Sequence, residues 1–197
     1  MKQETLRELR RKSIHVIPGV LAIPVVVWLG NPIATAIAAF FFALYAVHEA
    51  VLRLGLRVEV PIASHTFRVM ARREELEGGY FTGTVYFWFS TLLIVALMEP
   101  HRAAASVMVS SFGDAAAAVV GREVGGPRLP FNRRKTLAGS AAMFLAAFAS
   151  CLVAGVPLFP SLVASIVSTL AEAATTSSTL DELTVPAASA LTLGLLA

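Results

Sequence analysis

The chain has 197 residues, of which 56% are hydrophobic and 15% charged, and its formal net charge is +3. A soluble domain contains about 25% charged residues, and a disordered chain combines low hydrophobicity with high charge, so the composition excludes both classes. The single cysteine, Cys151, excludes a scaffold of intrachain disulfides. The composition predicts an all-α, polytopic membrane helix bundle, with residues 1–197 as a single integral-membrane domain.

Seven apolar stretches approach the length of about 20 residues that a helix needs to cross a bilayer. In chain order they are 16–29, 33–52, 80–98, 103–120, 137–156, 161–174 and 183–197. The first and the last two are short, which leaves six or eight spans as alternatives to seven. Residues 4–13 predict an amphipathic helix on the inner leaflet, and residues 61–79 predict an interfacial helix that ends at Gly78 and Gly79.

The positive charges are concentrated before the first stretch and in the longer connections between the stretches. Of the 16 Lys and Arg residues, all but Arg102 lie before the first stretch or in the longer polar connections. Because cytoplasmic loops collect Lys and Arg, we expect the N-terminus and these connections on the cytoplasmic side of the cell membrane. This charge suits anionic headgroups or an anionic substrate, and no motif predicts a nucleic-acid partner.

Asp114 is the most unusual residue of the fourth stretch. It precedes Gly121 by seven residues, which corresponds to ~10 Å of helix. An ionisable side chain at such a depth is costly and by default indicates function. We expect a metal ligand; the alternative is a carboxylate that packs helices together by bonding to Ser110 or Ser111.

The connection after Asp114 combines glycines with cations. Gly121 and Gly125 permit close backbone approach to an anion, and Arg133, Arg134 and Lys135 suit phosphates. The P-loop pattern GxxxxGK[ST] is absent. By itself the connection fits ordinary positive-inside composition, but together with Asp114 it predicts a site for a metal-complexed phosphate.

Other polar residues fall on the same expected face. Arg11 and His15 share one side of a helix at spacing i, i+4, and Glu172 and Asp181 flank the turn between the last two stretches. The alternatives are an interfacial histidine and, for Asp181, a helix cap. The mixed charges of 61–79 indicate a solvated face, with Arg72 or Arg73 as alternative phosphate contacts.

The order of these residues resembles the CTP-dependent polyprenol kinase family, which includes dolichol, phytol and farnesol kinases and CTP-dependent diacylglycerol kinase. The resemblance rests on Glu8, Arg11, Lys12, His15, Gly19, Glu49, Gly113-Asp114-Ala115, Ala117, Gly121, Gly125, Lys135-Thr136, Gly139-Ser140, Glu172, Asp181 and Leu183-Thr184-Val185-Pro186. It spans nearly the whole chain. The chain departs from the family at Ala138, where a glutamate is usual, and at Glu182, where an asparagine is usual.

The resemblance implies transfer of the γ-phosphate of CTP, with Mg²⁺, to the hydroxyl of a membrane lipid alcohol at the cytoplasmic face. The implied catalytic residues are Asp114, Lys135, Glu172, Asp181 and His15, and the implied metal ligands are Asp114, Glu172 and Asp181. The implied nucleotide-binding residues are Lys12, Gly113, Gly121, Gly125, Arg133, Arg134, Lys135, Thr136, Gly139 and Ser140.

Several alternatives stay open at this point. Either Glu172 or Asp181 is the base for the lipid hydroxyl or a further metal ligand. The acceptor is a polyprenol, a short isoprenoid alcohol or diacylglycerol, since all need a similar apolar groove. A cytidylyltransferase that makes a CDP-lipid and a small non-enzymatic transporter are the alternative functions; a transporter usually shows internal repeats, and none is visible here.

Overall fold

The computed structural model describes residues 9, 11–177 and 179–196, and in this part of the chain every named element is a helix. The first helical segment runs from Arg11 to Trp28 and contains α2 (Ile17–Ala22) and the π-helical turn η1 (Ile23–Trp28). The wide turn lies at Pro24, which has no N–H to donate and whose carbonyl accepts from the N–H of Leu29 at 3.1 Å. The first stretch is therefore longer than the sequence predicted. Most of the predicted amphipathic segment 4–13 lies outside the described residues.

The remaining helices follow the predicted stretches. They are α3 (Asn31–Arg53), α4 (Ala63–Met70), α5 (Arg73–Gly78), α6 (Thr82–Leu97), α7 (Pro100–Met108), η2 (Val109–Gly113), α8 (Asp114–Glu123), α9 (Leu137–Val153), α10 (Leu158–Ala174) and α11 (Asp181–Leu195). The segments α7, η2 and α8 form one helix from Pro100 to Glu123. Among the described residues, this helix, Arg11–Trp28 and Asn31–Arg53 are long and apolar enough to cross a membrane, while α6, α9 and α10 are shorter apolar helices. The count of seven spans stays a prediction.

The single interfacial helix expected over 61–79 is two short helices instead. The backbone is extended at Ala71 and Arg72, and the N–H of Arg72 donates to the Glu75 carboxylate at 2.7 Å, which starts α5 as a new helix. The predicted end is confirmed, because Gly79 has the left-handed conformation, with φ of 63°, that favours glycine.

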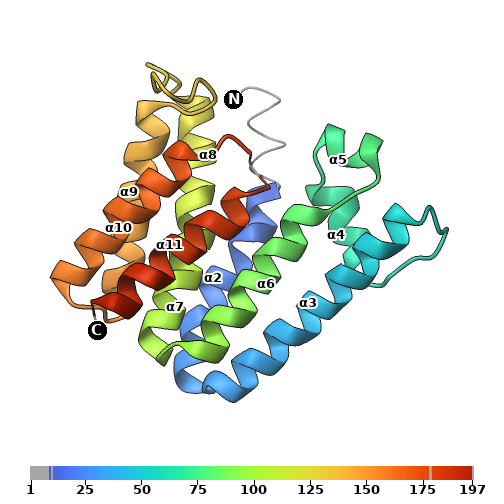
Figure 1. Ribbon diagram of the computed structural model, residues 1–197, viewed down its shortest axis with the longest axis horizontal. Coiled ribbons are helices and arrows are strands. Elements are labelled where there is room, and N and C mark those ends of the chain that lie inside the picture. Colours follow the sequence, from blue (N-terminus) through green and yellow to red (C-terminus); the bar gives the residue numbers. More distant parts are fainter. Residues whose placement is uncertain (1–8, 10, 178, 197) are drawn as a thin grey trace.

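The two ends of the bundle differ in character. Figure 1 shows the α8–α9 and α10–α11 connections and α5 at one end, and the α6–α7 and α9–α10 turns at the other. Buried apolar side chains from η1, α3, α6, α7, α9, α10 and α11 pack between these ends as a continuous core. The end with the longer connections is here named the basic end. The segments that carry the charged candidate residues Lys12, Asp114, Lys135, Glu172 and Asp181 meet there.

Glycines permit the closest helix crossing at this end. A Cβ on Gly139 in α9 would lie 2.9 Å from the carbonyl oxygen of Ala117 and 3.3 Å from the Cα of Gly121, both in α8. The absence of a side chain at Gly139 and Gly121 therefore allows α8 and α9 to pack closely against each other.

We expect Gly139→Ala to push α9 away from α8, because the neighbouring atoms are backbone and cannot rotate aside. Overpacking of this kind costs ~1–3 kcal/mol, so thermal unfolding in detergent should occur at a lower temperature. Gly194→Ala in α11 is the control, since a Cβ there meets nothing within 4 Å. Equal unfolding temperatures for the two variants would contradict this account of the crossing.

Candidate functional site

The first charged cluster joins three segments at the basic end. The Lys135 Nζ, in the α8–α9 connection, donates to Glu172 Oε1 at 2.5 Å on α10 and to Asp181 Oδ2 at 2.8 Å on α11. Both carboxylates are 4% exposed. Burial opposes the charge on Lys135, but the two carboxylates outweigh it and raise the pKa of the Lys135 ammonium above its ordinary value. Lys135 therefore stays a cation throughout the neutral range.

The backbone around Lys135 is held in place by the end of α10. The amide of Asn132, which is 3% exposed, donates to the carbonyl oxygens of Ala173 and Thr175, both at 2.9 Å, and the Arg134 guanidinium donates to Thr176 O at 2.9 Å. Carbonyls in the last turn of a helix lack intrahelical partners, so the end of α10 provides acceptors. This attachment places Lys135 between the two acids.

The second charged cluster surrounds Asp114. The Lys12 ammonium is ion-paired with Asp114 Oδ2, and His15 Nε2 lies 3.5 Å from that oxygen and 3.6 Å from Glu182 Oε2. Ligand atoms of His15, Asp114 and Glu182 lie within 4.8 Å of one another, the spacing of a group that can hold a metal ion. Asp114 thus has Lys12 as its partner, and the expected alternative, bonding to Ser110 or Ser111, is not observed among the described contacts.

The backbone at Glu182 is fixed by a neighbouring proline. Pro186 in α11 has no N–H, so the carbonyl of Glu182 four residues earlier loses its helical partner. That carbonyl accepts from the Ser90 hydroxyl of α6 at 3.2 Å instead. The hydrogen bond couples α11 to α6 directly beside the second cluster.

A polar cavity of about 320 Å³ opens beside both clusters. It is lined by five cations and four carboxylates: Arg11, Arg72, Arg122, Arg134 and Lys135, with Glu74, Asp114, Glu172 and Asp181. Such a mixture suits a ligand that itself carries both signs. A phosphate group complexed with a metal ion is a ligand of this kind.

The predicted nucleotide-binding residues divide into two groups. Gly121, Arg134, Lys135, Thr136, Gly139 and Ser140 line the polar cavity, and Lys12 contacts Asp114 at its edge. Gly113, Gly125 and Arg133 do not line it. A Cβ on Gly113 would meet Met143 of α9, whereas one on Gly125 would meet nothing within 4 Å. These two glycines therefore lie away from the site expected for them, in a helix contact and in an open loop.

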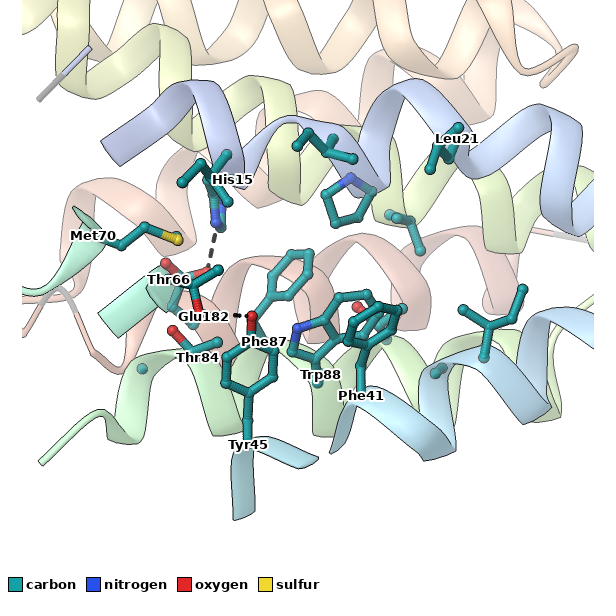
Figure 2. Close-up of a pocket in the computed structure, with 18 of the residues that line it drawn as sticks. His15, Leu21, Phe41, Tyr45, Thr66, Met70, Thr84, Phe87, Trp88 and Glu182 are labelled. Atoms are coloured by element: carbon teal, nitrogen blue, oxygen red, sulfur yellow. Dashed lines mark hydrogen bonds and ion pairs between the residues drawn. The ribbon is translucent and has the colours of Figure 1, made fainter. Parts of the chain in front are cut away.

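An apolar cavity of about 300 Å³ lies between the first helix, α3 and α6 (Figure 2). Its walls include Leu21 of α2 and the aromatic rings of Phe41 and Trp88, which stack at a centroid distance of 4.5 Å. His15 and Glu182 close one end, and Figure 2 shows their side chains directed toward each other there. The cavity is therefore apolar along its length and polar at one end.

The two cavities meet at the second cluster. Arg11 and Arg72 line both cavities. Asp114 faces the polar cavity, Glu182 faces the apolar cavity, and the His15 ring lies between the two carboxylates. An anionic ligand on one side and an apolar molecule with a polar head on the other would therefore meet at this point.

Sequence reasoning missed the roles of Glu182 and Asn132. In the sequence, Glu182 stands out only as a departure from a family pattern. It follows Asp181 directly at the start of α11, and the two side chains line different cavities, Asp181 the polar one and Glu182 the apolar one. Glu49, by contrast, serves the fold: its carboxylate accepts from the N–H of Phe81 and from the Thr82 hydroxyl, which holds the start of α6 to α3.

The described residues thus form an all-helical protein in which a polar and an apolar cavity meet. Three similar curated proteins have related names. A protein named probable phytol kinase, chloroplastic, from Triticum aestivum is 32% identical over 148 residues, which cover 72% of this chain and 47% of the relative. The Zea mays protein of the same name is 32% identical over 143 residues, covering 72% and 46%. A probable phytol kinase 2, chloroplastic, from Glycine max is 31% identical, covering 72% and 44%.

The chain belongs to the polyprenol kinase family of which these phytol kinases are members. It spans about half the length of the curated relatives that it matches. No family model matches the chain, and no solved structure matches it.

Replacement of Lys135 should destabilise the protein, because it leaves Glu172 and Asp181 buried without their cation. Loss of one partner from a buried ion pair costs about 3–5 kcal/mol, so Lys135→Met should unfold earlier than the wild type. Because the pKa of Lys135 is raised, this difference should persist across neutral pH and shrink at alkaline pH, where the wild-type ammonium deprotonates. The triple variant with Glu172→Gln and Asp181→Asn removes the unpaired charges and should recover stability; no recovery would contradict the assignment.

Proposed function

We propose that the protein is a kinase that transfers the γ-phosphoryl group of CTP, complexed with Mg²⁺, to the hydroxyl of an isoprenoid alcohol. The observation that carries the proposal is the contact between the polar and apolar cavities at His15, Asp114 and Glu182. Phosphoryl transfer requires the donor phosphate and the acceptor hydroxyl to be in line and shielded, and catalysis depends mainly on positioning and charge. A junction between a charged and an apolar cavity supports this requirement.

The polar cavity supports binding of the nucleotide phosphates. Lys135 and Arg134 provide cations at one wall, and the hydroxyls of Thr136 and Ser140 provide donors beside them. The Ser140 hydroxyl has no hydrogen-bond partner within the described chain and is buried, so a phosphate oxygen can satisfy it. Lys12 is ion-paired with Asp114, which lines the same cavity.

The donor set at this site fits Mg²⁺. Magnesium prefers oxygen ligands and usually takes one or two carboxylates together with substrate phosphates. Asp114 offers such a carboxylate, with Glu182 less than 4.8 Å away, and Glu172 Oε2 and Asp181 Oδ1 are buried oxygens without a hydrogen-bond partner among the described residues. When bound, the ion would offset negative charge on the β- and γ-phosphates. Asp114 is the ligand we assign first, and Glu172 and Asp181 are assigned to position Lys135 and to complete the acidic wall.

The apolar cavity supports binding of the lipid alcohol. Its tail would lie along Leu21, Phe41 and Trp88, and its hydroxyl would reach the end closed by His15 and Glu182. The exposed side chains of Ile17, Leu21 and Ile37 also line the cavity, which supports lateral entry of the tail from the bilayer.

In the proposed reaction, the hydroxyl oxygen forms a bond to the γ-phosphorus while the bond from that phosphorus to the β–γ bridging oxygen breaks. The hydroxyl proton passes to His15 Nε2, which no residue of the described chain engages in a hydrogen bond and which lies between the two carboxylates. The products are the lipid phosphate and CDP. The choice of CTP as donor follows from the family resemblance.

We further propose that the site faces the cytoplasmic side of the cell membrane. The Lys and Arg residues of the longer connections gather at the basic end, and such residues favour the cytoplasmic side. The isoprenoid class of the acceptor is supported by the names of the relatives.

Asp114→Asn should abolish label transfer from γ-labelled CTP to phytol in detergent–lipid micelles with Mg²⁺, because it removes the proposed metal ligand and the partner of Lys12. We expect a loss of at least 10³-fold, comparable to the loss of other charge-stabilising groups in phosphoryl transfer, which are worth ~10³–10⁵. Glu123→Gln at the exposed end of the same helix is the control. Wild-type transfer in Asp114→Asn would exclude the metal assignment, and release of pyrophosphate instead of CDP would indicate a cytidylyltransferase.

Ala38→Leu should impair use of the alcohol and leave use of the nucleotide unchanged. Ala38 is 2% exposed and lines the apolar cavity, so a larger side chain takes space that the tail needs. We expect a rise in KM for phytol of about tenfold, the size of a loss of ~1.4 kcal/mol in binding, with an unchanged KM for CTP. Ala36→Leu, on the exposed face of α3, should behave as the wild type; an equal effect of both variants would argue against an acceptor in this cavity.

A further inference from the structure

Arg72 stands at the boundary between the two cavities. Among the described residues, it and Arg11 are the ones that line both the polar and the apolar cavity. Arg11 belongs to the first helix, next to Lys12. Arg72 comes from the other side of the site, from the short extended segment between α4 and α5.

The backbone of Arg72 is fixed although it lies between helices. Its N–H donates to Glu75 Oε2 at 2.7 Å, and Glu75 is 5% exposed and lines the apolar cavity. The carbonyl of Glu75 accepts from the N–H of Tyr80 at 3.2 Å, which ties α5 to the start of α6. The main chain of Arg72 is therefore anchored, and its side chain lines both cavities from this fixed position.

The surroundings of the Arg72 guanidinium are acidic. Arg72 interacts electrostatically with Asp181 of the first cluster and with Glu182 of the second. Lysines approach these acids from other segments: Lys135, in the α8–α9 connection, is ion-paired with Asp181, and Lys12, in the first helix, interacts electrostatically with Asp181 and Glu182. A phosphoryl group that passes from one cavity to the other would thus pass cations from three different segments, of which Arg72 lines both cavities.

We propose that Arg72 is a catalytic residue that binds the oxygens of the γ-phosphoryl group while it moves from the nucleotide to the lipid hydroxyl. The proposal rests on the proposed function. Charge on the transferring group spreads over three equatorial oxygens, and the planar guanidinium offers paired donors that match two of them. Arg72 stays protonated throughout; the bonds that form and break are those of the reaction above, and the hydroxyl proton still passes to His15.

The test compares Arg72 with its neighbour in the sequence. Arg73 forms an ion pair with Glu77 at 2.7 Å, its side chain is 91% exposed, and it lines neither cavity. Arg72→Ala, Arg72→Lys and Arg73→Ala should all fold, because the capping hydrogen bond of α5 uses the main-chain N–H of residue 72. The assay measures kcat and the KM for CTP and for phytol separately, with Mg²⁺ present.

We expect Arg72→Ala to lower kcat by ~10³-fold, the lower end of what an arginine at this step contributes, with both KM values within threefold of the wild type. Arg72→Lys should recover part of the loss, because it keeps the positive charge. The recovery should be incomplete, because an ammonium lacks the paired donors of the guanidinium. Added guanidinium ion should restore some activity to Arg72→Ala, and Arg73→Ala should match the wild type.

Three results would overturn the inference while the proposed function stands: wild-type kcat in Arg72→Ala, a change confined to KM, or an equal loss in Arg73→Ala. If the wild type itself transfers no phosphoryl group to any isoprenoid alcohol, the proposed function fails, and the inference fails with it.

Discussion

Two lysines, the buried Lys12 and the half-buried Lys135, hold the basic end of the bundle together. An ion moved from water into a protein interior loses several kcal/mol of solvation, which only close partners offset. Lys135 therefore keeps the α8–α9 connection against α10 and α11, and Lys12 keeps the first helix against α8. A packing that separated either lysine from its carboxylates would leave charges unpaired in an apolar surrounding. The position of the polar cavity follows from these contacts, since Asp114, Glu172 and Asp181 all line it.

The apolar cavity works under a different constraint from a pocket in a soluble enzyme. An alcohol that enters it from a bilayer exchanges one apolar surrounding for another, so the hydrophobic effect contributes little to binding. Under the proposed function, discrimination between lipid alcohols would come from the shape of the cavity and from its polar end. The stacked rings of Phe41 and Trp88 and the buried Ala38 define the shape, and His15 with Glu182 defines the end. A polar head that did not reach His15 would gain nothing from the cavity that the membrane does not already provide.

Sequence patterns predicted the helices and the acidic and basic residues of the site, because apolar stretches and isolated charges within them are local signals. They did not predict which charges pair. Asp114 and Lys12 are 102 residues apart, and Lys135 and Asp181 are 46 apart, so only tertiary packing brings them together. The break at Arg72 was not predicted, since it depends on the hydrogen bond that the Arg72 N–H donates to the Glu75 carboxylate, which the mixed charge of the segment does not indicate. Glycines were the least reliable guide to the phosphate site. Gly121 and Gly139 do line the polar cavity, but the close crossing of α8 and α9 is enough to explain why neither residue has a side chain.

Glu182 shows how a single departure from a family pattern changes the chemistry available at the junction. Its carbonyl is turned to Ser90 because Pro186 cannot donate to it, and its carboxylate faces His15. An asparagine here would offer a neutral amide, whereas glutamate adds negative charge next to Asp114. Ala138 in α9 stands where the family usually has a glutamate. Compared with the family pattern, this chain therefore lacks one carboxylate on α9 and has an additional one, Glu182, at the end of the apolar cavity. A proton that leaves a hydroxyl at this end of the apolar cavity would therefore meet a carboxylate as well as the His15 ring.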